Sequence, residues 1–182
     1  MFTAYCLNRE DAWYTVAIIT LILASVIVLI DQLSKVWAYN NLSQVGQIKG
    51  IPGILDFMYV ENTGAAFGIL PNQNWLFIIL AMLVLVVALY VLFKKKIKSK
   101  LFLASMALMI GGAVGNMIDR IIRGFVIDFL KLSFFPPVCN FADYCLTVGA
   151  VLLLVYILFF SSIAEKNDER LKQKTEFTQK KL

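Results

Sequence analysis

The sequence predicts an all-α membrane protein with four transmembrane helices and a small extracytoplasmic sheet-and-helix segment between the first two. Two observations carry this prediction. Of the 182 residues, 60% are hydrophobic and only 16% are charged, whereas soluble domains are about 45–50% apolar and about 25% charged. The hydrophobic residues also gather in four long uncharged runs. A soluble globule of this size could not bury so much apolar surface, which excludes a cytosolic enzyme, a disordered chain and a nucleic-acid module.

Each uncharged run is long enough to cross a bilayer. The runs contain 18, 19, 18 and 21 residues, and a helix needs about 20 residues, at about 1.5 Å each, to cross roughly 30 Å of hydrocarbon. The first run is longer than the core of a signal peptide, and no small-residue cleavage site follows it. We therefore expect a single domain over residues 1–164 and a charged cytoplasmic tail over 165–182. The expected spans are 13–31, 75–93, 101–118 and 142–164.

Basic residues indicate the orientation of the chain in the membrane. Residues 94–100, between the second and third spans, contain five lysines, and the tail contains six Lys or Arg. Basic loops stay in the cytoplasm. Both termini and the lysine-rich loop are therefore expected on the cytoplasmic side, with residues 38–74 and 119–139 outside. These basic runs are explained by topology and contact with anionic lipid, so we expect no nucleic-acid partner.

The outer segment 38–74 is expected to fold. A short β-prone stretch, residues 57–60, lies among turn-forming residues, which are Gly46, Gly50, Pro52, Gly53 and Gly64. This pattern favours a hairpin or small sheet lying on the membrane.

The sequence contains no histidine and three cysteines, Cys6, Cys139 and Cys145. The absence of histidine excludes Ser-His-Asp and Cys-His nucleophile systems and His-ligated zinc. Three cysteines suit neither a disulfide framework nor a Cys-rich metal site. Ser34 and Lys35 do not form a catalytic pair, because neighbours on a helix point about 100° apart. We expect no metal and no cofactor, and chemistry that relies on carboxylates.

Four carboxylates are expected at the outer side of the membrane. Asp31, Asp119 and Asp143 lie at the outer ends of spans, and Asp128 follows nine residues after Asp119. A carboxylate at such a depth is costly and is usually kept for function or for a partner. Asp128 lies in the apolar run Phe125–Leu130 and has the least obvious structural role.

The other three aspartates also have structural explanations that the sequence leaves open. These are an ion pair between Asp119 and Arg120, a capping box formed by Asn140 and Asp143, and an i,i+4 ion pair between Asp31 and Lys35. The glycines at 111, 112 and 115 equally fit close helix packing or close approach of a lipid.

Two adjacent carboxylates could hydrolyse a peptide bond without histidine or metal. Like charges a few ångströms apart suppress the second ionisation, so the pair holds one proton. One member then takes a proton from water while the other donates to the carbonyl oxygen. Asp143 lies at the positive end of a helix dipole, which favours its ionised form. Asp128, among apolar side chains, is the better carrier of the shared proton.

Five sequence blocks, in order over roughly residues 13 to 160, resemble those of lipoprotein signal peptidase (signal peptidase II), an aspartic membrane protease family of bacteria. The blocks are Asp31-Gln32-Leu33-Ser34-Lys35, Asn62-Thr63-Gly64-Ala65-Ala66-Phe67-Gly68, Gly111-Gly112-Ala113-Val114-Gly115-Asn116-Met117-Ile118-Asp119-Arg120, Val126-Ile127-Asp128-Phe129 and Asn140-Phe141-Ala142-Asp143. Cys139 stands where the family commonly has Phe.

The resemblance implies an intramembrane endopeptidase in the bacterial cytoplasmic membrane. It would remove the signal peptide from prolipoproteins by cleaving on the amino side of the diacylglyceryl-modified cysteine. The catalytic dyad would be Asp128 and Asp143. Supporting or substrate-binding roles would fall to Asp31, Lys35, Asn62, Gly64, Asn116, Asp119, Arg120, Asn140 and Ala142.

Two other functions remain open from the residues alone. A proton-coupled transporter would use intramembrane carboxylates as a relay, although it would favour acids at the midplane or inverted repeats. A non-catalytic assembly factor would use its aspartates only in ion pairs. For the peptidase, the expected partners are prolipoprotein substrates and membrane lipid. Four spans suffice for a monomer.

Overall fold

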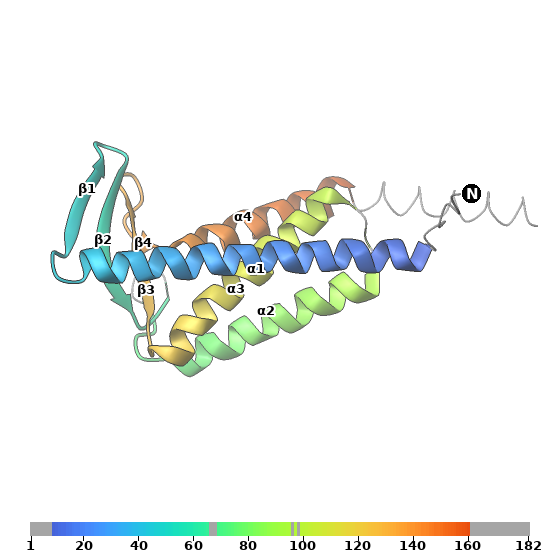
Figure 1. Ribbon diagram of the computed structural model, residues 1–182, viewed down its shortest axis with the longest axis horizontal. Helices are drawn as coiled ribbons and strands as arrows, with labels where there is room; N and C mark the ends of the chain where they lie inside the picture. The colour runs from blue at the N-terminus through green and yellow to red at the C-terminus, as the bar shows by residue number, and fades with distance from the viewer. Residues whose placement is uncertain (1–8, 66–68, 96, 98, 161–182) are drawn as a thin grey trace, which may run out of the picture.

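The structure is a computed structural model that describes residues 9–65, 69–95, 97 and 99–160. Four long helices run side by side, and a small sheet lies at one end of them (Figure 1). The helices are α1 (Arg9–Leu42), α2 (Asn74–Lys95), α3 (Lys100–Ile122) and α4 (Phe141–Val155), and α4 continues as a π-helical turn, Tyr156–Phe160. The expected tail, 165–182, and the last residues expected for the fourth span, 161–164, lie outside the described residues.

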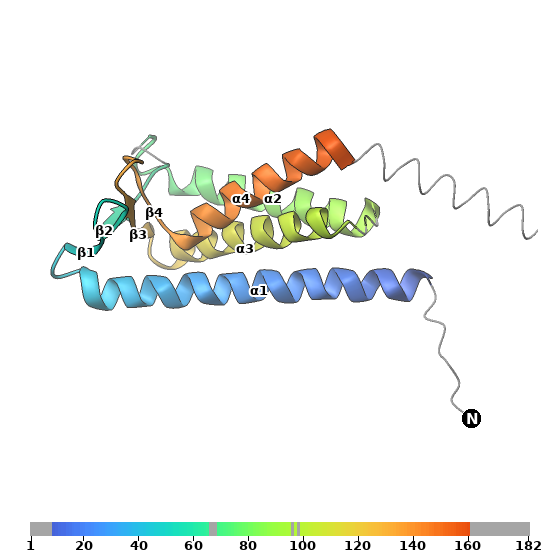
Figure 2. The ribbon, with the colours of Figure 1, turned by 90° about the horizontal axis from the view of Figure 1, so that it is seen from above.

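The four helices are long and apolar enough to cross a membrane. Large hydrophobic side chains are exposed along α1, α2 and α4, as expected for surfaces that face lipid. In contrast, α3 contributes a buried stripe that includes Phe102, Met106 and Ile110. Figure 2 shows α3 in the middle of the bundle, between α1 and the other two helices. The central helix α3 therefore contacts the other three helices, and its side chains can meet residues from all of them.

The first helix is longer than the sequence analysis predicted. The expected span ended at residue 31, but α1 has 34 residues and continues to Leu42, a length of about 51 Å at about 1.5 Å per residue. The span was expected to end at residue 31 because the charges at Asp31 and Lys35 interrupt the apolar run. Both side chains are fully buried against neighbouring helices, so they do not end the helix. Similarly, α3 continues past the expected residue 118, which places Asp119 inside the helix.

The sheet is antiparallel with strand order β1-β2-β3-β4. Its strands are β1 (Gln47–Ile51), β2 (Leu55–Asn62), β3 (Val126–Leu132) and β4 (Val138–Cys139). The sheet was expected between the first two spans, but two of its strands, β3 and β4, come from the segment between α3 and α4. In the described part of residues 43–73, which omits 66–68, no helix accompanies the strands.

The end of α1 holds the sheet in place. Ala38 and Leu42 of α1 form a small core with Ile127 and Phe129 of β3. Side chains alternate between the two faces of a strand, so Asp128 points away from this core. An apolar contact on one face of β3 thus determines the position of the carboxylate on the other face.

Three glycines of α3 lie where the helices approach each other closely. A Cβ at Gly111 would lie 2.6 Å from the Ile27 side chain, and one at Gly112 would lie 2.6 Å from the carbonyl oxygen of Ala142. A Cβ at Gly115 would lie 2.5 Å from a carboxylate oxygen of Asp31. Helix packing therefore accounts for these glycines, which the sequence alone left undecided.

Candidate active site

Asp128 and Asp143 lie on different elements and are joined through Asn140. Asp128 is on β3, and Asp143 is in the first turn of α4. The side-chain nitrogen of Asn140 donates to Oδ1 of Asp128 at 2.7 Å. Its backbone N–H donates to Oδ2 of Asp143 at 3.1 Å, and its side-chain oxygen accepts from the Asp143 N–H at 3.0 Å. The predicted capping box is thus confirmed, and it also links the two carboxylates.

Two further asparagines complete the contacts of this pair. The side-chain nitrogen of Asn62 donates to Oδ2 of Asp128 at 2.8 Å, and that of Asn116 donates to Oδ1 of Asp143 at 2.7 Å. All four carboxylate oxygens therefore accept an N–H from a neutral group. Within the described ranges, no ion pair involves Asp128 or Asp143. Hydrogen bonds therefore position the two carboxylates, and no cation in contact neutralises their charge in the described residues.

Asp128 is suited to hold a proton near neutral pH. Its side chain is almost completely buried, with 2% exposed. Burial, and next the negative charge of Asp143, raise the pKa of Asp128 to about 7, against the lowering effects of Asn62, Asn140 and Lys35. Suppression of the second ionisation is the behaviour expected of two neighbouring carboxylates. Asp128 can therefore act as a proton donor near neutral pH.

A buried ionic cluster lies next to this pair. The Lys35 ammonium lies 2.8 Å from Oδ2 of Asp31, 3.1 Å from Oδ2 of Asp119 and 2.9 Å from Oδ1 of Asn116. Arg123 pairs with the other oxygen of Asp119. The predicted i,i+4 pair of Asp31 and Lys35 is thus confirmed as part of a larger network. Through Asn116, the network reaches Asp143.

Asp119 and Arg120 do not pair with each other, and this possibility from the sequence analysis was wrong. Successive helical residues point in different directions. Asp119 faces Lys35, whereas Arg120 donates to the carbonyl oxygen of Gly64 at 3.2 Å. The Arg120 guanidinium also lies over the Phe77 ring, 5.0 Å from its centroid. Arg120 thus ties the segment after β2 to α3.

The remaining predicted residues join the same network. Gly64 donates its N–H to the side-chain oxygen of Asn62 at 2.9 Å. Ala142 donates its N–H to Oδ1 of Asp31 at 3.0 Å. Every residue that the sequence analysis selected for the site is therefore connected to the others by hydrogen bonds or ion pairs.

Two further residues of the network, Gln32 and Arg123, were not expected in the site from the sequence. The Gln32 side chain donates to the carbonyl oxygen of Gly115 at 3.1 Å and to Oδ1 of Asp119 at 3.4 Å. Arg123 follows Asp119 by four residues, a spacing that could have indicated an ion pair on one helix face. For Gln32, no spacing along the sequence indicates a contact with Gly115 or Asp119.

A cavity of about 240 Å³ opens beside Asp128. Its lining consists of Val60, Glu61, Asn62, Thr63, Gly64, Ala65, Pro71, Asp128, Pro137 and Val138. The volume exceeds that of a water molecule, whose share of liquid volume is about 30 Å³. Water can therefore be accommodated next to Asp128.

The chain is similar to known proteins of one family. The family model described as signal peptidase (SPase) II matches residues 5–159. Among curated relatives, the lipoprotein signal peptidase of Clostridioides difficile strain 630 is 46% identical over 134 residues, covering 73% of this chain and 90% of that protein. The lipoprotein signal peptidase of Symbiobacterium thermophilum is 40% identical over 143 residues, covering 77% and 94%.

A solved structure of a bacterial membrane enzyme, obtained by the in meso method at 2.3 Å resolution, has the same fold. It superposes with a TM-score of 0.70 and 30% identity, covering 76% of this chain and 87% of the other. Together with the four apolar helices, these similarities identify a multi-pass bacterial membrane protease. The chain belongs to the signal peptidase II family.

Proposed function

We propose that this protein is an aspartic endopeptidase that removes signal peptides from prolipoproteins, cleaving on the amino side of the diacylglyceryl-modified cysteine. Its catalytic groups would be Asp128 and Asp143. One observation supports this assignment most strongly: Asn140 contacts both carboxylates, and the charge of Asp143 contributes to raising the pKa of Asp128 to about 7. A pair that holds one proton provides both a base and an acid.

The reaction then follows from these two protonation states. Ionised Asp143 takes a proton from water as the water oxygen attacks the scissile carbonyl carbon, while Asp128 gives its proton to the carbonyl oxygen. The tetrahedral intermediate collapses when Asp128 takes back the hydroxyl proton and Asp143 gives its proton to the leaving amine. The products are a signal peptide with a free carboxylate and a lipid-modified cysteine with a free amino group. Both aspartates return to their starting states.

Neither alternative function gains support. An assembly factor that uses its aspartates only in ion pairs would pair Asp128 and Asp143 with cations. In the part of the chain that the structure describes, Lys35 and Arg123 pair instead with Asp31 and Asp119. A proton-coupled transporter does not agree with the protease family of the chain.

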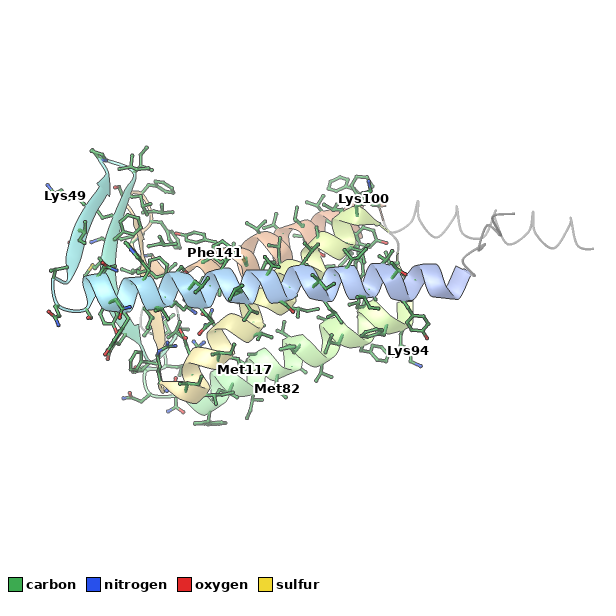
Figure 3. The ribbon with its side chains drawn as sticks, viewed as in Figure 1. Lys49, Met82, Lys94, Lys100, Met117 and Phe141 are labelled. Carbon is green, nitrogen blue, oxygen red and sulfur yellow. The ribbon has the colours of Figure 1, made fainter. Side chains whose placement is uncertain are left out.

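We further propose that the sheet and the dyad lie at the outer face of the membrane, with both termini in the cytoplasm. Lys49 of β1 and the pair Lys94 and Lys100, which flank the connection from α2 to α3, lie at opposite ends of the molecule (Figure 3). The connection is lysine-rich and so favours the cytoplasmic side. At the outer face, a lipid-anchored substrate would reach the dyad by lateral diffusion. Residues 1–164 would act as one domain and a monomer would suffice.

Accessibility of introduced cysteines tests this orientation. In a variant without the native cysteines at 6, 139 and 145, Lys49→Cys and Lys100→Cys are labelled in intact cells with a membrane-impermeant maleimide. We expect labelling at position 49 and protection at position 100 until the membrane is permeabilised. The reverse pattern would contradict the proposed orientation.

Cleavage of a defined substrate tests the reaction. Purified protein in detergent is given a diacylglyceryl-modified prolipoprotein peptide and the same peptide without lipid. We expect wild-type protein to cleave only the lipid-modified form, between the cysteine and the preceding residue. Asp128→Asn and Asp143→Asn should each abolish cleavage while thermal unfolding shows a folded protein. Near-normal cleavage by either variant would exclude the dyad.

A further inference from the structure

The three asparagines around the dyad share one arrangement. Each has a side-chain oxygen that accepts from a fixed donor, and a side-chain nitrogen that donates to a carboxylate. For Asn62 the fixed donor is the Gly64 N–H, and for Asn140 it is the Asp143 N–H. For Asn116 it is the ammonium of Lys35, at 2.9 Å.

This arrangement determines which way each amide points. A backbone N–H and an ammonium can only donate, and an ionised carboxylate can only accept. The side-chain oxygen of Asn116 must therefore face Lys35, so its nitrogen must face Oδ1 of Asp143, where it lies at 2.7 Å. If the amide were reversed, its oxygen would face the carboxylate and its nitrogen would face the ammonium. Both contacts would then be repulsive.

We propose that Lys35 is a positioning residue for the reaction, which acts through Asn116 to keep a hydrogen-bond donor on Asp143. This inference rests on the proposed function. Of the three fixed donors, Lys35 alone is a side chain, so it alone can be removed by substitution. Lys35 belongs to α1, whereas Asn116 and Asp143 belong to α3 and α4, so the contact also aligns three helices.

The surroundings of Lys35 explain why it stays in place. Its three N–H bonds meet three acceptors, one each on Asp31, Asp119 and Asn116. The side chains of Lys35, Asp31 and Asp119 are fully buried, so water does not compete for these donors. The rotation that would withdraw the ammonium from Asn116 would also break its contacts with two buried carboxylates.

Asp31 extends the same positioning effect to the backbone. It accepts the N–H of Ala142, the residue before Asp143, at 3.0 Å. The cluster therefore contacts both the donor to Asp143 and the first turn of the helix that carries Asp143. Because Lys35 touches neither the cavity lining nor Asp128 in the described contacts, its loss should lower turnover and leave substrate affinity unchanged.

The test removes Lys35 without leaving a net charge in the cluster. In Lys35→Met/Asp31→Asn, one positive and one negative charge are lost together, and the amide introduced at position 31 can still accept the Ala142 N–H through its oxygen. The reference variant is Asp31→Asn alone, which loses the same carboxylate charge and retains the Lys35 acceptors on Asp119 and Asn116. A second control is Lys49→Met, because Lys49 is exposed on β1 and should have no effect. Cleavage of the diacylglyceryl-modified peptide gives kcat and KM for each variant.

We expect kcat of the double variant to fall at least tenfold relative to Asp31→Asn, with KM changed by less than about twofold, as befits an interaction that acts in the chemical step. The same substitutions in an Asn116→Ala background should cause no further loss of kcat, because the group through which Lys35 acts is absent. Equal kcat for the double variant and Asp31→Asn would overturn the proposal. So would a loss that persists in full without Asn116.

Two further measurements ensure that the experiment decides for or against the positioning role of Lys35. If Lys35→Met/Asp31→Asn does not fold, as judged by thermal unfolding, the cycle with Asn116→Ala is run with Lys35→Arg. This variant keeps the charge but offers a planar fork with different donor geometry, and its loss of kcat must again vanish in the Asn116→Ala background. Asp128→Asn in the same assay separates the hypotheses. If Asp128→Asn cleaves the peptide at a near-normal rate, the proposed catalytic dyad fails. If Asp128→Asn is inactive and the Lys35 variants keep full kcat, only the positioning role fails.

Discussion

Asn140 donates from its side-chain nitrogen to Oδ1 of Asp128 at a distance of 2.7 Å. The same residue is the N-cap of α4, the helix that carries Asp143. A helix cap, which usually has only a stabilising role, here links β3 to the first turn of α4. The two roles of Asn140 can be separated by substitution.

Asn140→Ser should fold nearly as well as the wild type but cleave its substrate poorly. Serine is a good N-cap, but its side chain is too short to reach Asp128. Loss of a hydrogen bond to a charged group costs about 1.5–3 kcal/mol, so we expect kcat to fall by roughly tenfold to hundredfold. Asn140→Ala should lose the same activity and, in addition, about 0.5–2 kcal/mol of stability. Activity of Asn140→Ser equal to the wild type would show that only capping matters.

The pH dependence of cleavage should report the protonation of Asp128. Burial and the charge of Asp143 raise the pKa of Asp128 to about 7. If Asp128 acts as the acid, its proton is present below this pH, so kcat/KM should fall as the pH rises through about 7. A profile that stays flat from about pH 5 to about pH 9 would argue against Asp128 as the acid.

Asn62→Ala should move this decline to higher pH. The hydrogen bond from Asn62 lowers the pKa of Asp128, because it stabilises the ionised carboxylate. Without that donor, the pKa of Asp128 rises further and the protonated form persists to higher pH. The measurement is the midpoint of the alkaline decline in kcat/KM for the variant and the wild type. A midpoint that moves to lower pH would contradict the assignment.

Gly115→Ala should damage both stability and activity. The added Cβ would lie 2.5 Å from Oδ2 of Asp31, the oxygen that contacts Lys35. Overpacking costs about 1–3 kcal/mol, and here it would displace a carboxylate of the buried cluster. Gly149→Ala in α4 is a useful comparison, because its Cβ would also be tight, 2.8 Å from the Met109 side chain and 3.1 Å from Leu108 and the Met109 backbone nitrogen, but would meet no residue of the buried cluster. We expect the thermal unfolding temperature and the kcat to fall more for Gly115→Ala than for Gly149→Ala.

A metal chelator should leave cleavage unchanged. All four oxygens of Asp128 and Asp143 accept N–H donors from Asn62, Asn116 and Asn140. A cation on these oxygens would have to approach the hydrogens of the amides, which carry positive charge. We expect the same initial rate with and without EDTA, and strong inhibition that is reversed by added divalent cations would indicate a metal-dependent reaction.

The sequence by itself determined the membrane class and four runs long enough to cross a membrane, and it named most of the residues that the hydrogen-bonded network joins. Uncharged runs of about 20 residues have few alternatives to a transmembrane helix, and carboxylates near the interface are rare enough to identify a site. The local features followed as well, because a capping box such as Asn140 with Asp143, or an i,i+4 pair such as Asp31 with Lys35, depends only on neighbouring residues.

Only the tertiary structure decided how these groups meet. The sequence could not show that α1 continues past Asp31, because the charges of Asp31 and Lys35 seemed to end the span. In the structure these two side chains are buried and paired with each other, and Lys35 also pairs with Asp119 of α3. Nor could it show that Val126–Leu132 pairs with β2, since strand pairing depends on contacts between segments far apart in the chain. The orientation of the Asn116 amide likewise depends on donors and acceptors from three helices. Pairing of that kind is a property of the packed molecule and leaves no pattern along the chain.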